Sequence, residues 1–205
     1  MKHHSEAFFF KPVSWFEPFQ WKQVFSASAS QNPESIHVDI GAGDGGFVCQ
    51  RARNHPEMNF LAVERLLGRA RKIARRALRE QLAHVRVARI EAAYAVERLF
   101  PASSIHTMTI LFPDPWPKRR HHKNRLIQRS FLERCATCLR ADGWLAIKTD
   151  DASYFEQISD ALAECKGLKR WQDVQPEILL PETTDFEREF LKEKRSVWFV
   201  AARRA

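Results

Sequence analysis

The sequence predicts an α/β fold with a mostly parallel, seven-stranded, doubly wound sheet and helices on both of its faces. Short apolar runs alternate along the chain with amphipathic stretches of helical period. Acidic side chains also follow one apolar run after another, and the carboxyl ends of parallel strands form the edge where α/β sheets bind ligands. These acids are Glu64, Glu91, Asp114 and Asp150, with Asp39 just ahead of a run of glycines.

The predicted elements follow from these local patterns. Strands are expected over residues 36–40, 58–63, 85–90, 105–112, 144–147, 168–174 and 196–201. Helices are expected from the glycines to Arg53 and over residues 66–82, 126–140 and 153–165, with a shorter helical stretch beginning near Pro181. We expect residues 1–35 to form an aromatic-rich arm and residues 36–205 to form the main domain.

Composition limits the class of protein. A chain of 205 residues with 44% hydrophobic residues can bury a core of its own. Its net charge of +8 favours a polyanionic partner, with nucleic acid ahead of a membrane surface. The sequence contains no apolar stretch long enough to span a membrane and no signal peptide pattern, so we expect a cytoplasmic protein without a membrane partner.

The four cysteines do not form the pattern of a disulfide framework. Cys135 and Cys138 have the spacing of a metal or redox pair, but no second pair accompanies them. Since both lie on the apolar face of a predicted helix, core filling is the simpler interpretation. We expect no metal.

The first 25 residues are crowded with aromatic side chains: Phe8, Phe9, Phe10, Trp15, Phe16, Phe19, Trp21 and Phe25. Rings beside lysines could stack on the bases of single-stranded nucleic acid. Packing against the domain is favoured instead, because exposing so many rings would reduce solubility.

The glycines Gly41, Gly43 and Gly45 lie between a predicted strand and a predicted helix. Glycines there allow a tight turn and let a ligand approach the backbone at a helix N-terminus. Glu64, at the end of the next strand, is placed to accept hydrogen bonds from a ribose. This pattern alone also fits a nicotinamide enzyme. The acids at the other strand ends favour S-adenosylmethionine, because a sulfonium and an amino group suit carboxylates and a pyrophosphate does not.

A proline-rich loop follows the strand that ends at Phe112. Prolines at 113, 115 and 117 hold their preceding residues extended, so Asp114 and Trp116 are displayed in a stiff loop. Basic side chains come next: Lys118, Arg119, Arg120, His121, His122, Lys123 and Arg125. Such a segment can be a solvated connection, but an isolated acid beside an anion-binding surface indicates chemistry on a nucleic acid.

The helix predicted over residues 66–82 combines an apolar face, from Leu66 to Leu78, with an opposite basic stripe. The stripe comprises Arg65, Arg69, Lys72, Arg76 and Arg79. It can be a solvated face or a phosphate-binding surface, and the pattern alone does not decide between them.

Taken together, these motifs resemble those of the bacterial tRNA (guanine-N7)-methyltransferases. The resemblance is carried by Asp39-Ile40-Gly41-Ala42-Gly43-Asp44-Gly45, Glu64, Glu91-Ala92, Phe112-Pro113-Asp114-Pro115-Trp116, Thr149-Asp150 and Thr184-Asp185-Phe186-Glu187. Glu91 stands where the family has a shorter Asp or Asn, and residues 192–195 replace a glycine-containing segment.

The resemblance implies a Rossmann-like class I methyltransferase that moves a methyl group from S-adenosylmethionine to N7 of guanosine 46 (tRNA numbering) in the variable loop. It implies that Asp114 is the catalytic residue, orienting the guanine edge and the methyl donor. The implied cofactor-binding residues are Asp39, Gly41, Gly43, Gly45, Glu64, Arg65, Glu91 and Ala92.

The resemblance also implies a set of tRNA-binding residues. Asp150, Thr184 and Glu187 would hold the base, while Lys118, Arg119, Arg120, His121, Lys123 and Arg125 would bind phosphates. Thr184 and Glu187 are also spaced as a helix capping box, which is the structural alternative for this pair. We expect a monomer or a homodimer.

Three other functions fit part of the sequence. A nicotinamide oxidoreductase would explain the glycines and Glu64 but not the Pro-Asp-Pro-Trp loop. A non-catalytic RNA-binding module would explain the charge but not the acids at the strand ends. A methyltransferase acting on another RNA or base would share every motif of the cofactor site.

Overall fold

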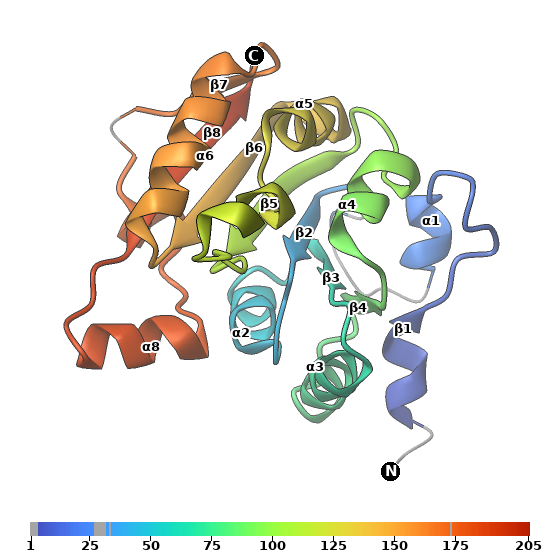
Figure 1. The fold of residues 1–205 in the computed structure, drawn as a ribbon. Helices are drawn as coiled ribbons and strands as arrows, with labels where there is room; N and C mark the ends of the chain where they lie inside the picture. The colour runs from blue at the N-terminus through green and yellow to red at the C-terminus, as the bar shows by residue number, and fades with distance from the viewer. Residues whose placement is uncertain (1–3, 27–31, 33, 173) are drawn as a thin grey trace.

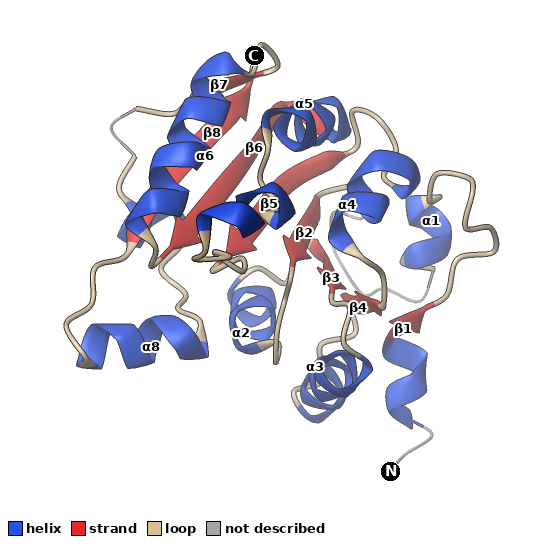
Figure 2. Ribbon diagram, in the orientation of Figure 1, coloured by secondary structure: helices blue, strands red, loops and turns tan. Residues whose placement is uncertain are grey.

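The computed structural model describes residues 4–26, 32, 34–172 and 174–205, which form one sheet with helices on both faces (Figures 1 and 2). The strands are β1 (Phe9–Phe10), β2 (Ile36–Ile40), β3 (Asn59–Val63), β4 (Val85–Ala88), β5 (Ile105–Leu111), β6 (Leu139–Thr149), β7 (Leu168–Arg170) and β8 (Trp198–Arg204). Their order in the sheet is β1-β4-β3-β2-β5-β6-β8-β7.

The helices are α1 (Trp21–Val24), α2 (Gly46–Asn54), α3 (Leu67–Arg79), α4 (Ala92–Tyr94), α5 (Arg129–Cys138), α6 (Ala152–Glu164), α7 (Pro176–Leu179) and α8 (Asp185–Lys192). Two 3-10 segments, η1 (His4–Phe8) and η3 (Arg119–Asn124), and a π-helical turn, η2 (Ala95–Leu99), complete the elements. Helices α1, α5 and α6 pack on one face of the sheet, and α2 and α3 pack on the other.

The sheet is parallel except at β8, which runs antiparallel to both β6 and β7. From β2 the chain builds the sheet outward through β3 and β4, and then returns to place β5 on the other side of β2. In doubly wound folds this reversal opens a crevice at the carboxyl ends of the two central strands. The site described below lies at this reversal between β2 and β5.

The sheet has eight strands where seven were predicted, because Phe9 and Phe10 pair in parallel with β4. Several N-terminal rings pack with the domain. Phe19 contacts Phe10, Trp21 and Phe100 at centroid distances of 4.9, 6.1 and 6.0 Å. Burying these rings removes apolar surface from water, which is the outcome favoured for this segment over base stacking.

The α3 helix is shorter than predicted, and its expected apolar face is incomplete. Ile73 and Ala77 are buried, but Leu66 and Leu67 are 48% and 36% exposed. Leu66 has extended backbone angles ahead of the helix, so it does not share the helical face of the later residues. It lines the cofactor cavity described below.

All four cysteines are buried free thiols. Cys135 and Cys138 lie in the main core, and burial raises the pKa of Cys138 to about 11. These two thiols therefore fill core space. Within the described ranges, no group of three potential metal-binding side chains comes together, and no helix is long and apolar enough to cross a membrane.

Candidate active site

The glycine turn between β2 and α2 adopts left-handed backbone angles. The φ angles of Gly41, Gly43 and Gly45 are 75°, 58° and 79°. A Cβ at Gly45 would lie 3.0 Å from two side-chain carbons of Ile73, so the α3 helix packs directly against this turn. No heavy atom lies within 4 Å of a Cβ built on Gly41, which leaves space for a ligand beside the bare backbone.

A cavity of about 570 Å³ lies at the carboxyl ends of β2, β3 and β5. We call it the cofactor cavity. It brings together five of the predicted cofactor residues and the predicted catalytic acid. These are Gly41, Glu64, Arg65, Glu91, Ala92 and Asp114.

Two glutamates in the wall of the cofactor cavity are already bonded to backbone amides. Glu64 accepts hydrogen bonds from Gly43 N at 3.1 Å and Leu66 N at 2.7 Å. Glu91 caps α4 by accepting from Ala93 N at 3.0 Å and Tyr94 N at 2.8 Å. Both carboxylates therefore fix the walls of the cavity, a role that the sequence pattern does not predict.

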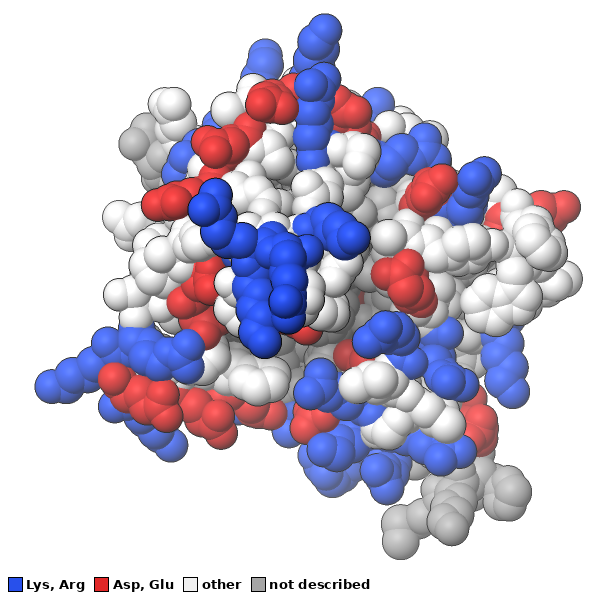
Figure 3. Space-filling view, in the orientation of Figure 1, with Lys and Arg blue, Asp and Glu red and all other residues white. Residues whose placement is uncertain are grey.

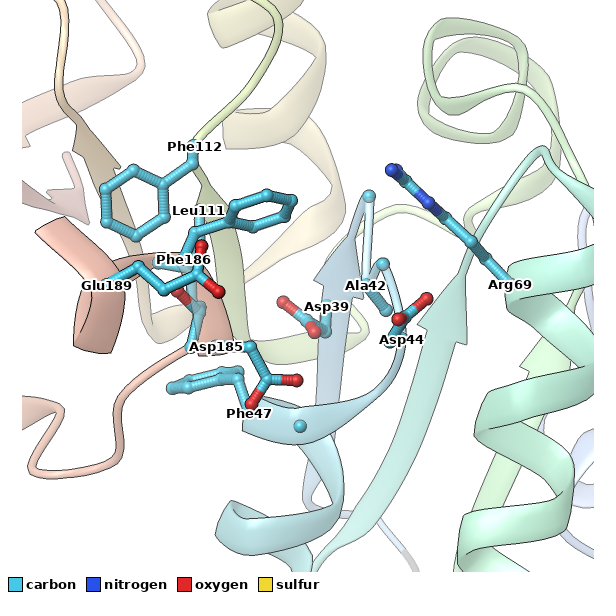
Figure 4. Close-up of a pocket in the computed structure, with 14 residues that line it drawn as sticks. Asp39, Ala42, Asp44, Phe47, Arg69, Leu111, Phe112, Asp185, Phe186 and Glu189 are labelled. Carbon is cyan, nitrogen blue, oxygen red and sulfur yellow. The ribbon is translucent and has the colours of Figure 1, made fainter.

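Asp39 lies on the other side of the glycine turn, in the wall of a second cavity of about 250 Å³ (Figure 4). We call this second space the α8 cavity, because helix α8 forms its opposite wall. Asp39 is 2% exposed. Thr109 donates to its Oδ1 at 2.7 Å, and His37 Nε2 lies 3.0 Å from the same Thr109 hydroxyl.

Burial raises the pKa of the Asp39 carboxyl to about 7, and the Thr109 hydrogen bond opposes this effect. Burial lowers the pKa of His37 well below its usual range. His37 and Thr109 are not among the predicted site residues. The sequence gives one indication of each residue, because each is a polar side chain in a mostly apolar strand.

The loop after β5 displays Asp114 as predicted. Asp114 is exposed, and its Oδ1 accepts from Trp116 N at 3.1 Å. Phe112 and Trp116, on either side of it, have φ angles of 54° and 44°. Left-handed angles at two aromatic residues are a strained conformation of the kind that concentrates at functional sites.

The basic segment after this loop is exposed in large part. Lys118, Arg119, Arg120 and Lys123 are exposed, and the His121 ring packs edge-on against Trp116 at 5.9 Å. Figure 3 shows a basic cluster near the centre of the face where η3 lies, and a second one lower on the same face over α3.

Arg125, which we expected to bind phosphate, has a buried side chain at the wall of the cofactor cavity. Its Nε donates to Pro115 O at 2.7 Å, and its other nitrogens donate to Gln157 Oε1 and Ser153 Oγ, both at 3.0 Å. The guanidinium also lies 4.8 Å from the centre of the Tyr154 ring. Arg125 therefore anchors the Pro-Asp-Pro-Trp loop to α6.

The three residues expected to hold the base are engaged with protein groups. Thr184 caps α8 by accepting from Glu187 N at 2.9 Å, which is the capping alternative. Glu187 is buried and forms an ion pair with Lys148. Asp150 forms an ion pair with Arg195. Of the three, only Thr184 lines the α8 cavity.

The donor set of the two cavities fits S-adenosylmethionine. Asp39 Oδ1 has one partner, Thr109, and no hydrogen bond from a described residue reaches Oδ2, which leaves an acceptor for an ammonium group. The open backbone at Gly41 lies between this acceptor and the larger cofactor cavity, since Gly41 lines both spaces.

Solved structures share this architecture. The 16S rRNA methyltransferase KamB aligns with a TM-score of 0.65 and 18% identity, covering 92% of this chain and 95% of KamB. The geranyl diphosphate C-methyltransferase from Streptomyces coelicolor, solved in complex with S-adenosyl-L-homocysteine, aligns with a TM-score of 0.58 and 16% identity over 91% of this chain and 75% of that enzyme. Fold and site together define an S-adenosylmethionine-dependent methyltransferase with the Rossmann-like fold.

The family follows from the sequence comparisons. The family model described as "Putative methyltransferase" (Methyltransf_4) matches residues 33–200. The tRNA (guanine-N(7)-)-methyltransferase of Syntrophotalea carbinolica is 32% identical over 199 residues, which cover 96% of this chain and 84% of that protein. The chain belongs to the methyltransferase family that this model describes.

Two further relatives carry the same name. The protein of Nitrosococcus oceani is 33% identical over 82% of this chain and 71% of its own length. The protein of Thermotoga maritima is 33% identical over 70% of this chain, but the matched region is only 44% of that longer protein.

Proposed function

We propose that this enzyme is a tRNA (guanine-N7)-methyltransferase, which methylates N7 of a guanosine in the variable loop of tRNA. The position of Asp114 carries the proposal. Its exposed carboxylate forms part of the wall of the cofactor cavity and directly precedes the exposed basic segment. A base held beside the methyl donor would therefore have its phosphates next to cations.

The chemistry needs little from the protein beyond placement and charge. Bound S-adenosylmethionine supplies the methyl group from its sulfonium. N7 of neutral guanine already presents a lone pair, so no proton has to be removed before the attack. The guanine ring becomes positively charged as the methyl group arrives, and the Asp114 carboxylate stabilises that charge while it orients the base.

The cofactor-binding role is divided between the two cavities. Gly41 and Gly43 let the donor lie against the backbone, and Asp39 accepts from its amino group. Glu64, Arg65, Glu91 and Ala92 form the wall on the adenosine side. Because Glu64 and Glu91 already accept from backbone amides, their remaining lone pairs are the acceptors left for the nucleoside.

The exposed basic segment and α3 provide two surfaces for RNA phosphates. Arg65 and Arg69 lie at the rim of the cofactor cavity, and Arg71 and Arg75 are exposed on another side of α3. No ion pair with a described acid involves these four arginines. A row of cations without acidic partners favours polyanion binding. We assign the reaction to the cytoplasm and to a monomer or homodimer.

The test is transfer of labelled methyl from S-adenosylmethionine to unmodified tRNA, followed by digestion and identification of the nucleoside. We expect 7-methylguanosine from the variable loop. Label in ribosomal RNA, with none in tRNA, would refute the tRNA substrate while leaving the enzyme class intact.

A further inference from the structure

His37 is a buried histidine to which the proposed function assigns no role. It precedes Asp39 by two residues on β2, so the two side chains lie on the same face of the sheet. Thr109 pairs with Asp39 across the parallel strands β2 and β5. His37 lines neither the cofactor cavity nor the α8 cavity. Any effect of His37 on the site must therefore pass through another side chain.

Packing holds the ring of His37 in one place. The side chain is fully buried, and its ring stacks on Phe60 at a centroid distance of 5.1 Å and an interplanar angle of 30°. The ring of Phe47 lies 6.2 Å away. Burial lowers the pKa of His37 well below its usual range, so the ring is neutral and carries one N–H. The place of that proton decides whether Nε2 donates or accepts.

One hydroxyl group connects His37 to Asp39. The Thr109 hydroxyl donates to Asp39 Oδ1 at 2.7 Å, and His37 Nε2 lies 3.0 Å from the same hydroxyl oxygen. A hydroxyl has only one proton to donate. Because Thr109 gives that proton to the carboxylate, its oxygen can only accept from Nε2. The geometry therefore puts the proton of the imidazole on Nε2.

The surroundings of the other ring nitrogen favour the same tautomer. His37 Nδ1 is buried, and no described residue bonds to it. A proton on Nδ1 would be a buried donor without an acceptor, which costs free energy. It would also turn Nε2 into an acceptor that competes with Asp39 for the Thr109 proton. With the proton on Nε2, neither cost arises.

This chain of hydrogen bonds fixes one oxygen of the Asp39 carboxylate. Oδ1 is bonded to Thr109, and no hydrogen bond from a described residue reaches Oδ2. Figure 4 shows the carboxylate between the glycine turn and the side chains of α8. A donor held at Oδ1 resists rotation of the carboxylate about its Cβ–Cγ bond, so Oδ2 keeps its orientation before a ligand arrives.

We propose that His37 is a positioning residue of the cofactor site: its Nε2–H directs the proton of the Thr109 hydroxyl to Oδ1 of Asp39, which keeps Oδ2 available to the ammonium group of S-adenosylmethionine. The inference rests on the cofactor-binding role proposed for Asp39, and it does not depend on which RNA is methylated. Thr109 transmits the effect, while His37 itself touches neither the cofactor nor the RNA.

The first test determines the tautomer of His37 by nuclear magnetic resonance of the full chain with labelled imidazole nitrogens. A protonated and a bare ring nitrogen resonate far apart, and the signals of His37 are those that disappear in His37→Gln. We expect the proton on Nε2, both in the free protein and with S-adenosylhomocysteine bound. A proton on Nδ1 would overturn the inference.

The second test measures the Kd for S-adenosylmethionine by calorimetry at about pH 8, where Asp39 is ionised. His37→Gln places an amide N–H near the position of Nε2 and should keep the Kd within about twofold of the parent value. The amide of His37→Asn is too short to reach Thr109. That variant should raise the Kd about threefold to tenfold, the range for one lost hydrogen bond.

His84→Phe is the matched control for these variants. His84 is also buried and also packs against Phe60, at 5.8 Å, but its Nε2 lies 2.9 Å from the backbone oxygen of Ala52. It lines neither cavity. Replacing it removes a buried imidazole without touching the chain that leads to Asp39, so the Kd should not change. Circular dichroism checks that each variant is folded.

A double variant tests whether His37 acts through Thr109. Thr109→Val removes the hydroxyl with little change of shape and should raise the Kd about tenfold or more, since the lost bond is to a charged group. Adding His37→Asn should then have no further effect, because the hydroxyl that it would release is already absent. Thr109→Ser keeps the hydroxyl and should retain most of the affinity.

The outcomes separate the inference from the proposals on which it rests. Equal affinities of His37→Gln and His37→Asn, or additive effects of His37→Asn and Thr109→Val, would overturn the inference alone. An Asp39→Asn variant that binds the cofactor as tightly as the parent would refute the role of Asp39 itself. If cofactor binding follows the expected pattern but no 7-methylguanosine forms in tRNA, the proposed substrate is wrong and the inference stands.

Discussion

The Nζ of Lys148 lies 2.6 Å from Oε1 of Glu187, and both side chains are more than nine-tenths buried. This ion pair joins β6, inside the sheet, to α8, which carries one wall of the α8 cavity. Glu187 Oε2 is also buried, and no described residue bonds to it. The position of α8 thus depends on a charge pair that is removed from water.

Removing one member of this pair should destabilise the protein strongly. Lys148→Met leaves the Glu187 carboxylate buried without its cation, and such changes cost about 3–5 kcal/mol. The measurement is the free energy of unfolding in urea. The double variant Lys148→Met/Glu187→Leu should recover most of the loss, because no buried charge remains. A single variant as stable as the parent would show that water reaches Glu187.

The buried carboxyl of Asp39 should make stability depend on pH. Its pKa in the fold is about 7, above the ordinary value of 3.8, so the folded state holds its proton to a higher pH than the unfolded chain does. Relative to Asp39→Asn, stability should be highest below about pH 4, fall as the pH rises to about 7 and level off above that pH, a total loss of at most about 4 kcal/mol. Urea unfolding at intervals from pH 4 to 8 tests this; parallel curves for the two proteins would contradict it.

The ionised form of Asp39 should also be the form that binds S-adenosylmethionine. The affinity should therefore rise between pH 6 and pH 8, and Asp39→Asn should weaken binding and flatten the pH dependence. Calorimetric titration with the cofactor measures both effects. Equal affinity of the variant at pH 8 would place the ammonium group elsewhere.

Two substitutions at Asp114 should separate its charge from its hydrogen bond. Asp114→Asn can keep the bond to Trp116 N, whereas Asp114→Ala loses it. If the charge matters for transfer, both variants should lose most of kcat, about tenfold or more, with tRNA affinity nearly intact. Asp142→Ala, a similar change at an exposed position of β6, serves as the control. Full activity in Asp114→Asn would limit this residue to shaping the loop.

The two basic surfaces should differ from other surface cations in the salt dependence of tRNA binding. Each phosphate contact contributes a little under one unit to the slope of log K against log salt concentration. Arg119→Ala/Arg120→Ala and Arg71→Ala/Arg75→Ala should each reduce the slope, while Arg129→Ala on α5 should not. A pair whose removal leaves the slope unchanged lies outside the tRNA footprint.

The packing of the glycine turn predicts that position 45 does not tolerate a residue larger than glycine. Gly45→Ala would place a Cβ 3.0 Å from Ile73 side-chain carbons at a φ of 79°. Strain of this kind costs about 1–3 kcal/mol. Gly68→Ala, on the α3 helix that packs against this turn, meets no heavy atom within 4 Å and is the control. In thermal unfolding, Gly45→Ala should therefore have a clearly lower Tm than Gly68→Ala.

Local patterns predicted the elements that lie within the sheet. The central strands are apolar and buried on both faces, so Ile36–Ile40 and Ile105–Leu111 follow the predicted ranges closely. Edge strands carry a weaker signal. Phe9–Phe10 forms a strand only because β4 lies beside it. The strand predicted over residues 168–174 covers only Leu168–Arg170 in the structure.

The cofactor side of the site was more predictable than the base side. The roles of Gly41 and Glu64 depend on their positions at the ends of strands, and a sequence shows those positions directly. Glu187 and Arg125 bond to the side chains of Lys148 and Ser153, which lie 39 and 28 residues away and which only the folded chain brings together. A basic run therefore indicates an anion-binding surface without telling which of its members is turned inward.

The burial of Arg125 has a consequence for recognition. Because this side chain bonds to Pro115 and to α6, the loop that carries Asp114 is tied to the rest of the molecule at its far end, as the prolines stiffen it within. An RNA arriving at this surface finds the acid and its neighbouring cations already arranged. Little conformational entropy remains to be lost when the complex forms. By holding the loop in place, Arg125 can therefore contribute more to RNA affinity than it would by one further contact to a phosphate.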